Sequence, residues 1–309
     1  MGERVSNARF YDPWAVTVGL IVSRHGGIDA ALMSVESVHP GLLVREGAMS
    51  PTKFVSYMLI PLFAGMFPHL FMHWLTAREA KSFRWPVVLY PICIAVVWLP
   101  SVLLGVMGRV DFAGLEGPAA NAVLVKVIDL HAPGILAGLL GAGVFGAVMS
   151  SLDSQVLVVG TMFTQDGVRH YGIRNMSEPQ QVLFGRIFVT AILAIVFALS
   201  LVVDRSIFRL GIWSFSGFSA LFPVLVASVF WRRTTSRGVI AAFATVAVTW
   251  VYFLQRSWSD PGYSLWGTGL MPVVAMTIAS SVVLVIGSLV SRPPEDDRVR
   301  RFFEAEGSA

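Results

Sequence analysis

The chain has 309 residues, of which 55% are hydrophobic and only 14% charged, and its mean hydropathy is +0.69. Soluble domains carry about 25% charged residues, so this composition excludes an ordinary soluble fold and predicts a membrane protein embedded in a lipid bilayer. The net charge of +4 comes with no basic stripe of interleaved aromatic residues, so we expect no nucleic-acid partner. The single cysteine, Cys93, excludes an intramolecular disulfide and a thiolate metal cluster.

A short apolar segment at 14–22 comes first and predicts a partial helix. Residues 24–52 are more polar and predict an extracellular or periplasmic loop, and the chain ends in a charged tail at 292–309. Between them lie segments long enough to cross a bilayer, which takes about 20 residues. These segments predict an all-α polytopic membrane protein with spans at 54–76, 85–107, 133–165, 183–203, 209–231, 238–255 and 268–290.

Basic residues gather in every second loop between the predicted spans. The positive-inside rule therefore puts the C-terminus and the loops at 77–84, 166–182 and 232–237 in the cytoplasm. All loops agree with this one orientation, and we expect a multi-pass protein of the plasma (inner) membrane.

The predicted span 54–76 is interrupted by Pro61, Gly65 and Pro68. Proline removes a backbone donor, so carbonyls freed in such a span must face protein, water or a ligand. Interrupted spans point to the binding site of a transporter, although a simple kink is the alternative. His69 and His73 are four residues apart and could contact a metal ion. No third ligand lies near them, so we expect no metal there and favour a polar lining of a cavity.

The predicted span 133–165 carries small residues at every fourth position, which lets another helix approach closely in lipid. That packing role does not explain Asp153, because a carboxylate at membrane depth costs roughly 2.5–3.5 kcal/mol. Hydroxyl, carboxylate and carbonyl oxygens are hard ligands that suit an alkali or alkaline-earth cation. We therefore predict a cation site on this helix. The small residues are Gly138, Ala142, Gly146, Ser150 and Ser154.

Residues 211–223 mix serines with aromatic residues and include Gly217 and Pro223, which loosen a helix. The pattern predicts either a wall that offers both stacking and hydrogen bonds or an ordinary packing surface between helices.

Three of these motifs, in this order, resemble the sodium:solute symporter family, whose members carry sugars, proline, pantothenate and monocarboxylates. The stretch from Ala147 to Ser151 resembles the family's A-x-x-S-[ST] motif, and Phe67-Pro68-His69 is similar to its Q-P-H. Residues 216–238 resemble its S-G-x-x-A-x-x-x-P stretch, which ends in a Phe-Trp-basic-basic-Thr-Thr turn. The resemblance covers residues 54–255 and, more loosely, 13–290.

The resemblance implies a leucine-transporter-type fold, in which two inverted five-helix repeats move around a central site. Residues 54–231 would form the second repeat and residues 232–291 two further transmembrane helices, preceded by the partial helix and loop of residues 1–53. The first repeat would be missing, so the chain is expected to be the C-terminal part of a transporter that lacks its N-terminal half.

The resemblance also implies a function, sodium-coupled symport of a small organic solute, with sodium as the coupling ion and no other cofactor. Family members hold sodium with a carbonyl and two hydroxyls, which correspond here to Ala147, Ser150 and Ser151. Some members hold another sodium one turn along, at the positions of Asp153 and Ser154. A proton on Asp153 is an alternative, which would make the protein a proton-coupled symporter.

The solute would be contacted or gated by five residues in the interrupted helix and the aromatic segment. Two of them depart from the family pattern, because the family has Gln where this chain has Phe67 and Arg where it has His73. A non-transporting truncated product or an accessory membrane subunit is the other reading. We expect no enzyme, because no nucleophile elbow, H-E-x-x-H or phosphate loop occurs. The five residues are Phe67, His69, His73, Trp213 and Ser216.

Overall fold

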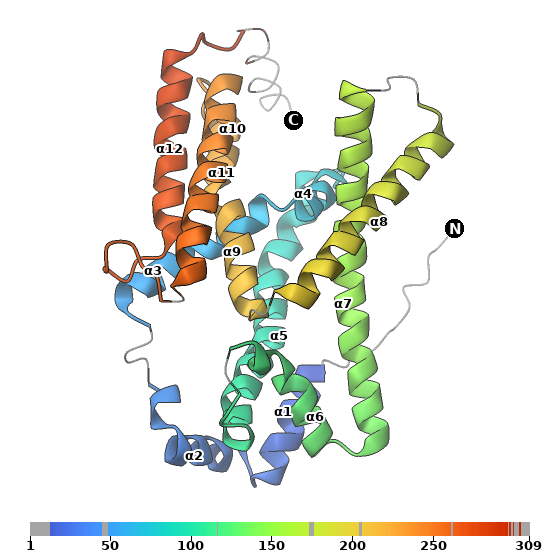
Figure 1. The fold of residues 1–309 in the computed structure, drawn as a ribbon, viewed down its shortest axis with the longest axis vertical. Helices are drawn as coiled ribbons and strands as arrows, with labels where there is room; N and C mark the ends of the chain where they lie inside the picture. The colour runs from blue at the N-terminus through green and yellow to red at the C-terminus, as the bar shows by residue number, and fades with distance from the viewer. Residues whose placement is uncertain are drawn as a thin grey trace. The chain divides into compact units, whose positions relative to one another are not determined.

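The computed structural model describes residues 13–44, 49–115, 117–172, 176–203, 206–260 and 262–295, and residues 297, 299 and 303. Within these residues every regular element is a helix, and one isolated bridge joins Leu265 to Leu270 (Figure 1). The predicted all-α fold is confirmed. The predicted cytoplasmic tail at 292–309 lies mostly outside the described residues.

The chain divides into two compact units, Met1–Arg45 with Thr76–Ile207, and Glu46–Leu75 with Phe208–Ala309. The first unit contains α1 (Pro13–Arg24), α2 (Ile28–Val38), η1 (Pro40–Leu42), η3 (Ala80–Phe83), α5 (Arg84–Asp111), η4 (Gly117–Ala122), α6 (Val123–His131), α7 (Gly134–Met162), η5 (Phe163–Arg169) and α8 (Glu178–Val202). The second unit contains α3 (Pro51–Leu59), η2 (Ile60–Gly65), α4 (Pro68–Leu75), α9 (Ile207–Ala220, from Phe208 on), α10 (Phe222–Phe230), α11 (Ser236–Ser259) and α12 (Pro272–Val290).

Membrane-spanning length follows the hydropathy of the sequence. Among the described residues, six helices are long and apolar enough to cross a bilayer, and the pair Pro51–Gly65 and Pro68–Leu75, bent by 50°, makes a seventh if it counts as one span. These elements coincide with the seven predicted spans, so the chain is a multi-pass integral membrane protein. The six helices are Ala80–Asp111, Gly134–Arg169, Glu178–Val202, Ile207–Phe230, Ser236–Ser259 and Pro272–Val290.

Local sequence explains where several of these helices begin. The Ser50 hydroxyl accepts a hydrogen bond from the Lys53 backbone N–H, and Pro51 then starts α3. Ser177 and Gln180 form a reciprocal capping box at the start of α8, and the Thr235 hydroxyl caps α11. Such caps satisfy backbone donors that the first helical turn leaves without partners.

The core of the first unit lies where α1, α2, α5 and α6 meet. The segment 24–52 is not the continuous loop expected from its polarity, because α2 and η1 form within it. Ala31 and Val35, one helical turn apart, are both buried, which gives this short amphipathic helix its packing face. The buried core residues are Val18, Ile21, Ala31, Leu104, Met107 and Val127.

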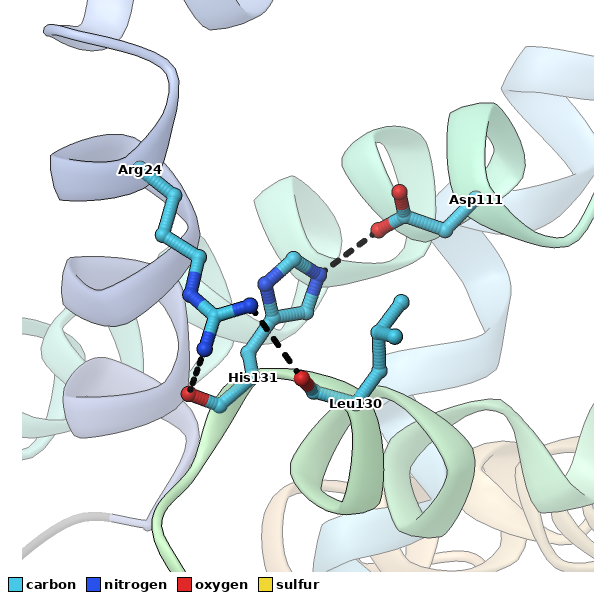
Figure 2. A network of polar contacts seen from close by, with 4 residues as sticks. All are labelled: Arg24, Asp111, Leu130 and His131. Atoms are coloured by element: carbon cyan, nitrogen blue, oxygen red, sulfur yellow. Dashed lines mark hydrogen bonds and ion pairs between the residues drawn. The ribbon is translucent and has the colours of Figure 1, made fainter.

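A polar network holds the end of α6, a helix that the hydropathy pattern does not predict (Figure 2). The buried His131 places its Nε2 atom 2.8 Å from Oδ2 of Asp111, the last residue of α5. Arg24, at the end of α1, donates hydrogen bonds to the carbonyl oxygens of Leu130 (3.2 Å) and His131 (3.1 Å). Carbonyls at a helix end lack partners within the helix, so Arg24 caps α6 and ties it to α1.

In the second unit α11 packs along α12, as Figure 1 shows. The two backbones meet at Gly238, where an added Cβ would lie 2.8 Å from the backbone N of Ser288 and 3.0 Å from the carbonyl oxygen of Leu284. The Ser288 hydroxyl accepts a hydrogen bond from the Thr235 N–H (3.3 Å). Small residues therefore set how closely these two helices approach, as is common for helix pairs in membranes.

Candidate functional site

The interrupted helix predicted at 54–76 is broken in the structure. The α-helix α3 ends at Leu59, a 3-10 segment follows, and α4 leaves at 50° after Phe67. Gly65 is buried where the 3-10 segment meets α10, since an added Cβ would lie 3.1 Å from Leu225 and 3.2 Å from Phe222. The break thus packs closely against two side chains of α10 at a glycine.

A side chain from α9 satisfies the backbone at this break. The fully buried Ser219 donates a hydrogen bond from its hydroxyl to the carbonyl oxygen of Ile60, at 2.7 Å. Ile60 is the residue at which the α-helix changes to a 3-10 helix. This carbonyl therefore has a protein partner at the break, as a backbone group at membrane depth requires.

Phe67 lies in an aromatic cluster that joins the break to α9. Its ring packs edge-on against Phe218 (4.8 Å between centroids) and against Phe215 (5.7 Å). Phe63 stacks on Phe215 at 4.2 Å, and His69 lies 5.2 Å from Phe67. The aromatic residues of 211–223 thus pack against the interrupted helix, and packing explains Phe215 and Phe218 without a ligand.

His69 and His73 both lie on α4, where His73 is exposed and His69 partly buried. In the described part of the chain no group of three His, Cys, Asp or Glu side chains is placed to hold a metal ion.

Trp213 and Ser216 line a pocket of about 410 Å³ that we call the Arg209 pocket. Ser216 is buried and donates to the carbonyl oxygen of Ile212 at 2.7 Å. Sequence reasoning singled out these two residues and missed the charged ones, because Lys53 and Arg209 look like ordinary residues at the ends of spans. The pocket is lined by Ser50, Lys53, Tyr57, Phe208, Arg209, Ile212, Trp213, Ser216, Ser257, Gly262, Tyr263, Ser264, Gly269, Met271 and Pro272.

The predicted cation ligands lie on α7, in the first unit. Ala147, Ser150 and Ser151 are exposed, so no described residue of the first unit covers this face of the helix. Ser154 is partly buried and donates a hydrogen bond to the carbonyl oxygen of Ser151 at 3.1 Å. This face of α7 therefore takes little part in packing within the first unit.

Asp153 also lines a groove of about 590 Å³ between α7, η5 and α8. Arg186 on α8 lines the same groove and was not singled out from the sequence. Helices α7 and α8 touch at the buried Gly160, where an added Cβ would lie 2.9 Å from the Val189 side chain. The described lining of this groove thus contains one further acidic side chain, Glu178, and one cationic side chain, Arg186.

A π-helical turn, η5, follows α7. It is held by the Thr164 hydroxyl, which donates to the Gly160 carbonyl oxygen at 2.9 Å, and by the Gln165 amide, which donates to Gln181 on α8 at 2.8 Å. Such turns widen a helix locally and occur often near functional sites. Here the turn forms the end of the groove that contains Asp153.

Comparison with known proteins gives a match over most of the chain. A family model described as the sodium:solute symporter family matches residues 14–245. The osmoregulated proline transporter OpuE of Bacillus subtilis is 26% identical over 294 residues, covering 93% of this chain and 58% of that protein. The sodium/proline symporter of Escherichia coli is 26% identical over 77% of this chain and 47% of its own length.

A third relative, the sodium/pantothenate symporter of Haemophilus influenzae, is 22% identical over 70% of this chain and 46% of its own length. The chain spans about half the length of the curated relatives it matches. The family and these relatives are transporters, in agreement with the expectation that the chain is not an enzyme.

Proposed function

Because the chain belongs to the sodium:solute symporter family, we propose that it takes part in sodium-coupled symport of a small organic solute across the plasma membrane. The observation that carries this proposal is the uncovered oxygen face of α7, where hydroxyls and a carboxylate lie within about one helical turn. Sodium prefers such hard oxygen ligands, and a carboxylate at membrane depth is functional by default.

We assign the ion to the Ala147 carbonyl and the hydroxyls of Ser150 and Ser151, with Asp153 and Ser154 one turn along. Residues at i and i+3 or i+4 share a face, which places the Ala147 carbonyl beside the two hydroxyls. The remaining ligands of a six-coordinate ion would come from an element that packs over this face. The second repeat, in this proposal, is formed by residues 54–231.

The solute would meet the interrupted helix and α9, where Phe67, His69, Trp213 and Ser216 lie in one unit. The relatives are named for proline and pantothenate, and both of these molecules are small organic acids. We propose a solute of comparable size, with His73 at the exposed end of α4 serving as a gate residue.

The test is uptake of radiolabelled proline and pantothenate by cells that express the natural protein, with and without a sodium gradient. We expect Ser151→Ala to raise the sodium concentration needed for half-maximal uptake at least tenfold, since it removes one ion ligand. Ser151→Thr keeps the hydroxyl and should retain most of the uptake. Sodium-dependent uptake that Ser151→Ala leaves unchanged would remove Ser151 from the site.

Asp153 supports a second candidate, coupling to protons, because its carboxylate could carry the proton. Asp153→Asn separates the two candidates. If sodium is the coupling ion, uptake by this variant still depends on sodium, with weakened sodium affinity. If a proton on Asp153 drives transport, the variant loses the stimulation of uptake by an inward proton gradient while exchange of solute persists.

A further inference from the structure

The Arg209 pocket combines positive charge with an apolar wall. Two cationic side chains, Lys53 and Arg209, line it, and none of its described lining residues is acidic. Asp260 lies close in sequence to the lining residues Ser257 and Gly262 but does not line the pocket itself. Its carboxylate accepts a hydrogen bond from the Gly262 N–H at 2.9 Å. Lys53 also has an interaction partner of its own, so the charge that favours an anion here is that of Arg209.

Helix ends add to that field. The pocket is lined by residues at the start of three helices, namely α3 from Pro51, α9 from Ile207 and α12 from Pro272. The N-terminus of a helix carries about half a positive charge, which stabilises a nearby anion. The C-terminal end of α11 carries partial negative charge. One of its carbonyl oxygens, that of Ser257, accepts a hydrogen bond from Arg209.

The guanidinium of Arg209 is held in place and keeps most of its donors. The bond to Ser257 is its only hydrogen bond or ion pair with the described residues, and arginine has five N–H donors. A guanidinium fixed at one nitrogen can present a second pair of N–H groups to a carboxylate in a bidentate arrangement. Planar recognition of this kind favours a carboxylate over a spherical halide.

The walls of the pocket are fixed by hydrogen bonds. The buried Ser56 hydroxyl accepts from the Met271 N–H at 3.1 Å, which ties α3 to the start of α12. Thr52 donates to the carbonyl oxygen of Thr268 at 2.8 Å, and Gly269, at φ +80°, leaves room for the Ser50 and Thr52 hydroxyls. The cavity is therefore preformed, which lowers the entropic cost of binding a small molecule.

The remaining walls indicate what the ligand carries besides its charge. Trp213 and Ile212 on α9 offer an apolar surface, and the Trp213 carbonyl accepts a hydrogen bond from the Trp250 indole at 2.8 Å, which fixes this part of α9. Tyr57 and Tyr263, which carry hydroxyl groups, also line the pocket. A volume of about 410 Å³ lies at the lower end of the usual range for small-molecule sites.

We propose that the Arg209 pocket binds a small organic carboxylate, with the carboxylate on Arg209 and the apolar body against Trp213. In the expected orientation the pocket opens on the face opposite the cytoplasm, because α3, α9 and α12 all begin there. The proposal rests on the proposed function in one respect, namely that the bound carboxylate is the solute before it crosses the membrane.

The test measures binding by calorimetry to the purified natural protein, using propionate, benzoate, L-proline and pantothenate, each with its matching primary amide. We expect at least one carboxylate to bind, with its amide roughly ten- to a hundredfold weaker, as for the loss of one charge-assisted hydrogen-bonding group. Arg209→Gln should remove this preference, and Arg209→Lys should keep part of it.

Arg256→Gln is the matched control, because Arg256 lies at the same end of α11, contacts the Tyr252 ring and does not line the pocket. It should leave the preference for carboxylates intact. If no carboxylate binds better than its amide, or if the preference survives in a folded Arg209→Gln protein, the pocket is not a carboxylate site.

Failure of the symport proposal gives a different pattern. The Ser151→Ala protein, altered in the other unit, should bind carboxylates at the Arg209 pocket with unchanged preference even though its uptake needs at least ten times more sodium. Carboxylate binding that depends on Arg209, in a protein whose uptake does not depend on sodium, would overturn the coupling proposal and leave this pocket assigned.

Discussion

Ser219 shows how one hydroxyl supports a broken membrane helix. Its hydrogen bond to the Ile60 carbonyl is buried, and water cannot replace it there. We expect Ser219→Ala to lower the free energy of unfolding by about 1–3 kcal/mol, the cost of a buried polar group without a partner. Chemical denaturation in mixed micelles measures this change. Ser214→Ala, an exposed serine on the same helix, should change stability by less than about 0.5 kcal/mol.

Asp111 is a second residue whose side chain contacts a distant part of the chain, since its Oδ2 atom lies 2.8 Å from Nε2 of His131. Asp111→Ala removes the only described partner of the His131 side chain, whose Nδ1 atom is already buried without a hydrogen bond. We expect a loss of about 1–3 kcal/mol in unfolding free energy, and a lower midpoint in a thermal melt. Asp129→Ala, which alters an exposed aspartate on α6, is the control. Equal melting temperatures for the two variants would mean that the contact between Asp111 and His131 contributes nothing to stability.

At this scale the sequence indicated which residue types carry chemistry but not their partners. The serines and Asp153 stand out because polar groups are expensive in lipid. Lys53, Arg209 and Arg186 do not stand out, since basic residues near span ends are common. Their roles depend on which helix ends contact one another. These are tertiary contacts, which a local sequence pattern does not predict.

At the scale of the helices, the prolines predicted the break in the α3–α4 span. A proline alone, however, does not predict that a helix breaks. Helix α5 contains Pro91 and Pro100 and still runs from Arg84 to Asp111 without interruption. The 54–76 segment differs in having a neighbouring serine that satisfies its backbone and a glycine that permits close packing. Sequence locates candidate breaks, and the packing of other helices decides which of them form.

The short helices α2 and α6 could not be predicted from hydropathy. Each is 9 to 11 residues long, too short to span a bilayer and marginal as an isolated helix in water. They form because their apolar faces are buried against α1 and α5. The long spans, by contrast, are specified by composition alone, because a 20-residue apolar segment in lipid must satisfy its own backbone.

Helix pairing in the second unit gives a prediction at the element scale. Gly238→Ala would place a methyl group against the backbone of α12, which cannot move aside as a flexible side chain could. We expect a loss of about 1–3 kcal/mol, as for other overpacked interfaces. Gly105→Ala in α5, where nothing lies within 4 Å, should be neutral or stabilising by up to about 1 kcal/mol. A Gly238→Ala protein as stable as the parent would contradict the close approach of α11 and α12.

For the whole molecule, the distribution of charge predicts how the chain lies across the membrane. The chain crosses the membrane once in the span Ala80–Asp111, which contains α5. The loop before α5 and the loop after it therefore lie on opposite sides of the membrane. Basic residues favour the cytoplasmic side for the loop before α5, which contains Arg78, Lys81 and Arg84.

The chain's single cysteine makes this orientation testable. In a Cys93→Ser background, Ser82→Cys and Ala113→Cys each place one thiol at an exposed position, on opposite sides of α5. We expect a membrane-impermeant maleimide to label Ala113→Cys in intact cells and to label Ser82→Cys only after permeabilisation. The Cys93→Ser parent is the blank. Labelling in the opposite order would invert the topology and would turn the Arg209 pocket toward the cytoplasm, where it would meet the solute after release rather than before capture.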